Sequence, residues 1–292
     1  MKLTLQNITK EYSQKTVLDT ISLELEPGIY GLLGANGTGK TTLMKIITNV
    51  IEPTRGEVYY DGRNIKENLI SFLSEIGYLP QDFSYYKDFT GLNFMRYLAT
   101  LKGVSAREVK NQSLKLLNEV GLSDVMNKKI RTYSGGMKQR LGIAQALIND
   151  PKILILDEPT VGLDPKERVK FRNLISSFSD NKIIILSTHI VSDVEYIADE
   201  ILLLKNGIIK DKGTPTELTK TIEGQVWDIQ ISPRELDHYL SDFVVSNQRH
   251  LEEENKISLR IISPTKPHET ARLVEPNLED LYLYYFREEN KR

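Results

Sequence analysis

The sequence predicts an α/β fold with a small α+β extension at its C-terminal end, and three observations support this prediction. The first is a set of continuous apolar runs typical of buried strands, at residues 29–33, 152–156 and 182–186. The second is helical apolar spacing between these runs, at residues 43–47 and 166–178. The third is a change to alternating apolar and polar positions after about residue 222. Continuous apolar strands that alternate with helices indicate a parallel sheet covered on both faces.

Antiparallel strands are expected beside this sheet. Residues 1 to about 30 alternate apolar and polar positions, which is typical of half-buried strands. Two turn pairs, Asp61-Gly62 and Asn206-Gly207, each follow a strand-like run and predict β-hairpins. We therefore expect an antiparallel β subdomain early in the chain and a hairpin near residue 206.

A helical insertion and a separate C-terminal unit complete the predicted organisation. Helical patterns fill the chain from about residue 83 to 150, at 92–101, 106–120 and 136–148. Further on, the patterns predict strands at 226–231 and 257–261 and helices at 233–240 and 278–286. We expect one domain over residues 1–220, with a helical subdomain at about 83–150, and an accessory α+β domain over residues 221–292.

The composition narrows the class of protein. The 292 residues include 38 basic and 40 acidic side chains, a net charge of −2, so no basic field points to a nucleic-acid partner. No apolar run approaches the ~20 residues of a membrane span, and the first six residues lack the apolar region of a signal peptide. The chain has no cysteine and therefore no disulfide framework. We expect a globular protein of the cytosol.

Residues 34–41, GANGTGKT, match GxxxxGK[ST], the P-loop pattern that holds phosphates. Gly34, Gly37 and Gly39 let the backbone curl, so that successive N–H groups point at phosphate oxygens. Lys40 supplies a positive charge and Thr41 offers a hydroxyl to Mg²⁺. The helix that begins there adds the positive end of its dipole. Because the pattern lies between a predicted strand and a predicted helix, as the motif requires, it predicts nucleotide binding.

Three further side chains are expected at the same edge of the sheet. Asp157 and Glu158 end one buried strand, and His189 follows the next. Asp157 can hold Mg²⁺, while Glu158 can orient and deprotonate the water that attacks a γ-phosphate. The alternative is structural: the two carboxylates open an ordinary turn, and a single histidine is more often structural than catalytic. The P-loop upstream favours the catalytic interpretation.

The segment from Thr132 to Arg140 predicts a second helix start of unusual composition. Ser134 is a natural N-cap, which alone explains a capped helix. The adjacent Gly135 and Gly136 weaken a helix unless the backbone must approach something closely, and an anion is the obvious candidate. Two phosphate-binding helix starts with only one P-loop suggest that the second serves the nucleotide of another subunit.

Taken together, these motifs resemble the nucleotide-binding subunit of an ABC transporter, over about residues 1–215. The resemblance implies a P-loop NTPase (RecA-like) core and a head-to-tail dimer that holds two ATP molecules, with Mg²⁺, between one P-loop and the other subunit's signature segment. It implies a separately encoded transmembrane permease as partner and a position on the inner face of the cell membrane. The segment 275–281, EPNLEDL, is similar to the closing segment of bacterial ABC-2-type exporters. The alternative is a soluble ABC ATPase that remodels a non-membrane target.

The resemblance also assigns roles residue by residue. Gln81 resembles the Q-loop glutamine that senses Mg²⁺ and the attacking water, and Lys40, Gln81, Glu158 and His189 form the implied catalytic set. The implied nucleotide contacts, with Tyr12 stacked on adenine and Asp164 in the D-loop, are Tyr12, Val17, Gly34, Asn36, Gly37, Thr38, Gly39, Lys40, Thr41, Thr42, Ser134, Gly135, Gly136 and Asp164. The implied metal contacts are Thr41, Gln81 and Asp157.

Some positions depart from the family pattern. Tyr133 stands where the signature usually has leucine, Met137 where it usually has glutamine, and Asn93 where many relatives carry glutamate. The Ser-Gly-Gly core of the signature is intact, so we expect activity to survive. Aromatic residues gather after Gln81, and by resemblance this region forms the groove into which a coupling helix of the permease docks.

Overall fold

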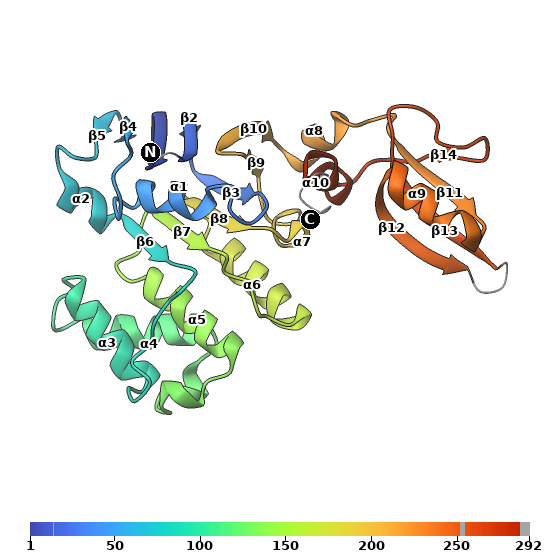
Figure 1. The fold of residues 1–292 in the computed structure, drawn as a ribbon. Helices are drawn as coiled ribbons and strands as arrows, with labels where there is room; N and C mark the ends of the chain where they lie inside the picture. Colours follow the sequence, from blue (N-terminus) through green and yellow to red (C-terminus); the bar gives the residue numbers. More distant parts are fainter. Residues whose placement is uncertain (14, 252–254, 287–292) are drawn as a thin grey trace. The chain divides into compact units, whose positions relative to one another are not determined.

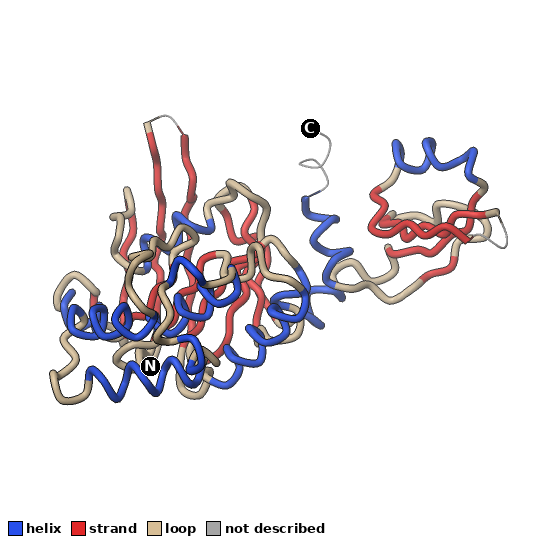
Figure 2. The backbone as a smooth tube through the Cα atoms, turned by 90° about the horizontal axis from the view of Figure 1, so that it is seen from below, coloured by secondary structure: helices blue, strands red, loops and turns tan. Residues whose placement is uncertain are grey.

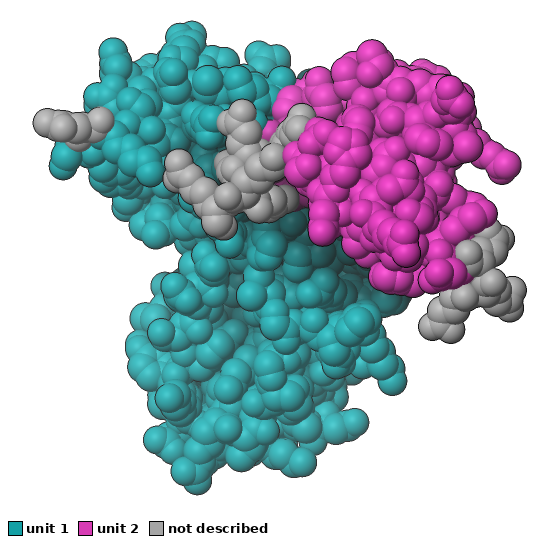
Figure 3. Space-filling model, turned by 45° about the vertical axis from the view of Figure 1, so that its right-hand side comes forward, with its two compact units in different colours: residues 1–210 teal, residues 211–292 magenta. Residues whose placement is uncertain are grey.

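The computed structural model describes residues 1–13, 15–251 and 255–286. The chain forms two compact units, residues 1–210 and residues 211–292 (Figure 3). The predicted fold class is confirmed, since the first unit contains a largely parallel sheet, an antiparallel β subdomain and a helical subdomain, and the second is a small α+β unit. Within the described ranges, none of the helices combines the length and the apolar character that crossing a bilayer requires.

The central sheet of the first unit has six strands in the order β10-β9-β3-β8-β7-β6. Their bounds are β3 Gly28–Leu33, β6 Ile76–Leu79, β7 Ile153–Asp157, β8 Ile183–Thr188, β9 Glu200–Lys205 and β10 Ile208–Gly213. Strands β6, β7, β8, β3 and β9 pair in parallel. Strand β10 returns through the expected turn, in which Asn206 (φ 52°) and Gly207 (φ 76°) both adopt positive φ. Strands β7 and β8 are buried along their whole length, which explains their uninterrupted apolar sequence.

The antiparallel sheet has the order β2-β1-β4-β5. Its strands are β1 Leu3–Tyr12, β2 Lys15–Leu25, β4 Arg55–Tyr60 and β5 Arg63–Asn64, and Figure 2 shows β1 and β2 as a long pair. Helix α1, Lys40–Ile47, contacts both sheets through β2 and β7. One apolar core joins α1 to both sheets, and it takes alternate residues of β7 and β8, such as Ile153 and Ile183. This core fixes the position of α1 against both sheets.

Three helices form the helical subdomain: α3 Gly91–Leu101, α4 Val109–Glu119 and α5 Gly135–Ala146 (Figure 1). They pack on one another, and α5 also contacts β6. The remaining helices of the unit are α2 Leu69–Ser74, α6 Pro165–Ser177 and α7 Val191–Val194. Sequence patterns anticipated α3 to α6 within a few residues at each end but not α2 or α7, which are too short to show a helical period.

The second unit has an antiparallel sheet in the order β12-β13-β11-β14. Its elements are α8 Pro215–Lys220, β11 Val226–Ile231, α9 Leu236–Asp242, β12 Val244–Leu251, β13 Lys256–Ile262, β14 Arg272–Leu273 and α10 Leu278–Phe286. The expected helix over 233–240 begins as a 3-10 turn, Pro233–Glu235, and continues as α9. An apolar core forms between α9 and the sheet, and Trp227 packs against it.

A buried ion pair attaches α10 to this sheet. The Asp280 carboxylate is fully buried and accepts hydrogen bonds from Arg260 Nη2 at 2.8 Å and Ser246 Oγ at 2.6 Å. The backbone N–H of Asn277 donates to it at 2.9 Å. The Asp280 charge is therefore well compensated, and its partners lie on β12, β13 and the turn before α10.

Candidate active site

The P-loop connects β3 to α1 and depends on glycine at the position before the helix. Gly39 has φ 108°, and a Cβ there would lie 2.6 Å from Leu18 Cδ2 and 2.9 Å from the Val17 carbonyl oxygen. Gly37 has φ 82°, but a Cβ added there would meet no atom within 4 Å. Gly39 is thus required by close approach to β2 as well as by backbone conformation. Val17 and Thr42 are expected nucleotide contacts, and both are partly buried. Val17 lies beside this turn, and Thr42 lies in the first turn of α1.

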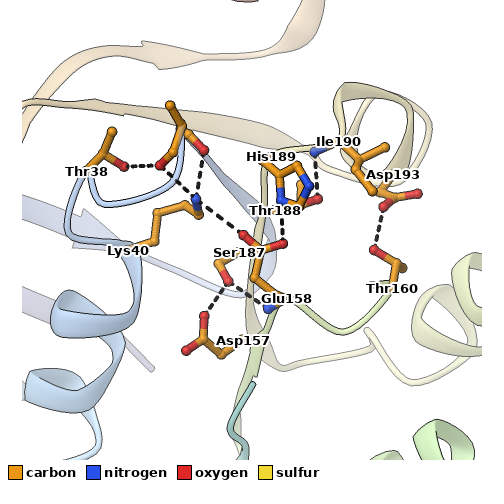
Figure 4. Close-up of polar contacts among 12 residues, drawn as sticks. Thr38, Lys40, Asp157, Glu158, Thr160, Ser187, Thr188, His189, Ile190 and Asp193 are labelled. Atoms are coloured by element: carbon orange, nitrogen blue, oxygen red, sulfur yellow. Dashed lines mark hydrogen bonds and ion pairs between the residues drawn. The ribbon is translucent and has the colours of Figure 1, made fainter. Parts of the chain in front are cut away.

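The Lys40 ammonium lies inside the loop and is only 6% exposed. Its Nζ donates to the carbonyl oxygens of Gly34 at 2.7 Å and Ala35 at 3.1 Å (Figure 4). The same atom lies 3.3 Å from Glu158 Oε1. The structure therefore brings the P-loop cation and one of the two predicted carboxylates into direct contact.

Ser187 joins the two carboxylates. Its hydroxyl donates to Asp157 Oδ1 at 2.7 Å and accepts from the Glu158 backbone N–H at 2.8 Å (Figure 4). Sequence reasoning missed this residue. The available signal was a hydroxyl residue at the end of β8, in register with Asp157 on β7.

Asp157 has the features of a magnesium ligand. Burial raises the pKa of its carboxyl, the Ser187 and Thr41 hydroxyls lower it in part, and the nearby Glu158 charge raises it. Among the described residues, its buried Oδ2 has no hydrogen-bond partner of standard geometry. Mg²⁺ in nucleotide sites is commonly held by one or two carboxylates together with substrate phosphates. Within the described residues, no cluster of three or more His, Asp or Glu is placed to hold a metal.

Glu158 and His189 form the second part of the site. His189 Nδ1 lies 2.9 Å from Glu158 Oε2, so one carboxylate oxygen faces Lys40 and the other faces the imidazole. The Glu158 side chain is 5% exposed and that of His189 is 38% exposed. Glu158 has φ 49°, a left-handed conformation that is uncommon for a side chain of this kind. The backbone turns sharply at Glu158 and directs its carboxylate between the P-loop and His189.

The second predicted phosphate-binding helix start lies in the helical subdomain. Ser134 caps α5, with its hydroxyl accepting from the Met137 N–H at 3.2 Å. A Cβ on Gly135 would meet nothing within 4 Å, whereas one on Gly136 would lie 2.9 Å from Glu167 Oε2. The hydrogen bonds and ion pairs of the described residues include none between Ser134, Gly135 or Gly136 and the P-loop of the same chain.

Several predicted site residues are not part of this contact network. Gln81 follows β6 and is exposed, and the described part of the chain gives its side chain no hydrogen bond. Tyr12 ends β1 at 48% exposure, with Lys10 Nζ 5.0 Å from its ring centre. Asn36 is exposed in the P-loop. Asp164 is the N-cap of α6 and accepts from the Glu167 N–H at 2.8 Å.

Tyr133, the departure at the start of the signature, has a structural role. Its ring is 4% exposed and its hydroxyl donates to the Val125 carbonyl oxygen at 2.8 Å. The hydroxyl also lies against Gly91, where a Cβ would come within 2.3 Å of it. The tyrosine therefore ties the start of α5 to the turn at Val125 through a hydrogen bond that leucine could not form, and its hydroxyl packs against the start of α3.

The aromatic residues after Gln81 form one connected group. Phe83 and Tyr85 pack inward against Phe94, with ring centres 6.1 Å and 5.8 Å from it. Three further rings form an exposed cluster, with Tyr86, Phe89 and Tyr97 at 54%, 37% and 39% exposure. Their ring centres lie 5.2 to 6.0 Å apart. We call these three residues the aromatic patch.

The fold and the P-loop site define the class of protein: a P-loop protein that binds and hydrolyses a nucleotide. The chain belongs to the ABC transporter family, whose model matches residues 18–161, and it is an ATP-binding, ATP-hydrolysing member. It is 40% identical over 209 residues to the lantibiotic transport ATP-binding protein SrtF of Streptococcus pyogenes, covering 71% of this chain and 88% of the relative. It is 38% identical over 252 residues to the bacitracin transport ATP-binding protein BcrA of Enterococcus faecalis, covering 83% and 80%.

Solved structures give the same result. An ATP-binding subunit of an ABC transporter superimposes with a TM-score of 0.67 at 28% identity, covering 76% of this chain and 93% of that one. A dimeric ATP-binding cassette in a post-hydrolysis state, bound to ADP and Pi, superimposes with a TM-score of 0.66 at 28% identity, covering 73% and 98%. The family expected from the motifs is therefore confirmed.

Proposed function

We propose that this chain is the ATPase subunit of a bacterial export system, which dimerises on ATP and drives a separately encoded transmembrane partner. The observation that carries the proposal is the contact of Lys40 and His189 with the two oxygens of Glu158, beside a complete P-loop. The similarity to lantibiotic and bacitracin transport proteins supports export. The proposal places the protein in the cytoplasm, at the inner face of the membrane, through its partner.

The residues of the site divide the chemistry among them. ATP phosphates enter the loop, where backbone N–H groups and Lys40 bind them. Asp157 and Thr41 would hold Mg²⁺, which neutralises phosphate charge when it is bound, and Gln81 would complete its contacts. Glu158 orients a water molecule and accepts its proton, while His189 holds the Glu158 carboxylate in place.

The dimer is part of the same proposal. Ser134, Gly135 and Gly136 would contact the γ-phosphate bound to a second copy of the chain, and Asp164 would lie at the contact between copies. Their separation from the P-loop within one chain supports this arrangement, as does the dimeric state of a cassette with the same fold. ATP binds the closed dimer more tightly than the open form, and this difference supplies the free energy for transport.

The aromatic patch is the proposed docking surface for the permease. Exposed aromatic rings are frequent anchors at protein interfaces. The patch borders a cavity of about 520 Å³ that Asn93 and Arg96 also line. A helix of the membrane partner would place an apolar face on these rings.

The decisive experiment is to tag the chain in its native cell, extract membranes in mild detergent and identify the proteins that co-purify. We expect a polytopic membrane protein, and we expect the Tyr86→Ala/Phe89→Ala variant to lose it. Ile70→Ala, which alters a residue that is 85% exposed elsewhere in the unit, is the matched control. Recovery only with ribosomes or another soluble assembly would reject the export proposal and favour a soluble ABC ATPase.

A further inference from the structure

A buried hydrogen bond joins the segment after Glu158 to the segment after His189. Thr160 Oγ1 donates to Asp193 Oδ2, across 33 positions of sequence (Figure 4). Thr160 is 1% exposed and Asp193 is fully buried. Neither residue is among the site residues that the sequence predicted. The bond lies to the side of the Glu158–His189 contact in Figure 4 and shares no atom with it.

The Asp193 carboxyl group is buried, and in the described part of the chain only one of its two oxygens is hydrogen-bonded. Among the described residues, its Oδ1 has no hydrogen-bond partner. By contrast, both oxygens of the buried Asp280 are engaged by Arg260. A buried carboxylate with an unpaired oxygen costs free energy that an apolar side chain would avoid. Asp193 lies in the first turn of α7, where an acidic side chain is favourable, and its one side-chain bond among the described residues, to Thr160, is the feature to explain.

Each end of the bond is fixed locally to a site residue. Thr160 lies two residues after Glu158, and its carbonyl oxygen accepts from the Leu163 N–H at 3.1 Å, in the turn that leads to Asp164. On the other side, the Asp193 N–H donates to the Ile190 carbonyl oxygen at 3.1 Å. The Ile190 N–H donates to Thr188 Oγ1 at 2.9 Å. His189 lies between these two residues in the sequence, so this hydrogen bond closes a tight turn around it.

We propose that Asp193 is a positioning residue that acts with Thr160 to hold His189 against Glu158. The bond between them adds a link beyond the strand ends, where the Ser187 hydroxyl already joins β8 to Asp157 and Glu158. It also connects the turn at Asp164 to His189, so that a movement of the first loop on dimerisation reaches the imidazole. This inference rests on the roles proposed above for Glu158 and His189.

The test is steady-state ATP hydrolysis and ATP binding by the purified full-length chain. Thr160→Val keeps the side-chain shape but removes the donor, and we expect kcat to fall about 10- to 100-fold, since misplacement by about 1 Å can have that effect. ATP affinity should stay within about twofold, because neither residue touches the P-loop. Thr160→Ser restores the hydroxyl and should restore kcat. Asp193→Asn keeps an acceptor and should lose less than Asp193→Ala.

Two controls separate positioning from stability and from the catalytic assignments. Ser113→Ala removes another buried hydroxyl, which donates to the Val109 carbonyl oxygen within α4, and should lower stability without lowering kcat per folded molecule. In a His189→Ala background, Thr160→Val should cause no further loss, because the two changes act on one interaction.

Other results would overturn the inference. A Thr160→Val variant with normal kcat, or an additive loss in the His189→Ala background, would show that the bond does not act through His189. If Glu158→Gln and His189→Ala each lower turnover strongly while Thr160→Val leaves it normal, the inference fails and the proposed site remains. If Glu158→Gln itself hydrolyses ATP normally, the catalytic assignment fails and the inference falls with it.

Discussion

Lys40 Nζ lies 3.3 Å from Glu158 Oε1, and both side chains are almost completely buried. The cation that is expected to bind phosphate is thus paired with the carboxylate that is expected to activate water. In the proposed roles, a phosphate entering the loop would compete with Glu158 for Lys40. The same event that binds the substrate would then release one oxygen of Glu158 to accept a proton, which would link binding to catalysis through one ion pair.

Replacing Lys40 with alanine should weaken ATP binding. A charge-assisted hydrogen bond contributes about 1.5–3 kcal/mol, which corresponds to a loss of about 10- to 100-fold in affinity. Titration with a fluorescent nucleotide measures this affinity. Lys45→Ala, one turn further along α1, is the control and should bind normally. Unchanged affinity in Lys40→Ala would count against the P-loop assignment.

Glu158→Gln should separate hydrolysis from binding. The amide keeps the shape and the contact with Lys40 but cannot accept a proton, so turnover should fall about 100- to 10,000-fold. ATP affinity should persist, and the variant should accumulate as an ATP-bound dimer. Phosphate release and size-exclusion chromatography with ATP are the measurements. Near-normal hydrolysis would disprove the general-base role.

Asp157→Asn should stabilise the protein while it damages the site. Burial raises the pKa of Asp157 above 3.8, so the folded state binds this proton more tightly than the unfolded state. The free energy of unfolding therefore falls as pH rises from 3.8 through the folded pKa, and asparagine removes this penalty at neutral pH. Urea denaturation with EDTA and no nucleotide should show a more stable variant at pH 7, with a difference that shrinks toward pH 4.

ATP hydrolysis provides a second test of the Asp157→Asn variant. The amide can still accept from Ser187 but is a poorer magnesium ligand, so hydrolysis should require more Mg²⁺. A variant that is less stable than the parent at pH 7, with an unchanged magnesium requirement, would contradict both parts of the prediction.

Gly39→Ala should be more harmful than Gly37→Ala. Both residues have positive φ, which costs roughly 1–2 kcal/mol for alanine. Only at Gly39 would the new Cβ also lie 2.6 Å from Leu18 and 2.9 Å from the Val17 carbonyl oxygen. Urea denaturation of the two variants side by side tests the ranking. Equal losses of stability in the two variants would mean that β2 accommodates the new Cβ at Gly39 without a free-energy cost.

Asp280→Ala should destabilise the C-terminal unit. Removing one partner of a buried ion pair leaves Arg260 without its main acceptor, and such changes typically cost about 3–5 kcal/mol. Trp227 is the only tryptophan of the chain and lies in this unit, so its fluorescence reports the unit's own unfolding. Tyr284→Ala, at a 45% exposed position of the same helix, is the control. An unchanged midpoint would assign the stability of α10 to its apolar contacts.

The features that sequence predicted are those encoded by neighbouring residues. The P-loop, the carboxylates at the end of β7 and the Ser134 cap are each recognised within about ten positions, and the strands that precede the first two are continuous apolar runs. Parallel pairing then places strand ends at one edge, which explains why His189 could be expected near Glu158. The family resemblance added roles that local patterns cannot supply.

The features that sequence missed are contacts between distant positions. Ser187 meets Asp157 across 30 positions and Thr160 meets Asp193 across 33. Nothing in either local sequence marks these pairs, because a serine or threonine at a strand end or turn has many uses. Strand β12 was also missed, because half of its residues are exposed and its burial does not alternate.

The left-handed backbone at Glu158 sets a limit on engineering this protein for thermal resistance. Its φ of 49° is a conformation that glycine or asparagine adopts more readily, so a search for stabilising substitutions would select this position. Either replacement would relax the backbone and remove the proposed proton acceptor at once. The turn is strained where the proposed chemistry requires a carboxylate, so thermal stability gained there would lower turnover.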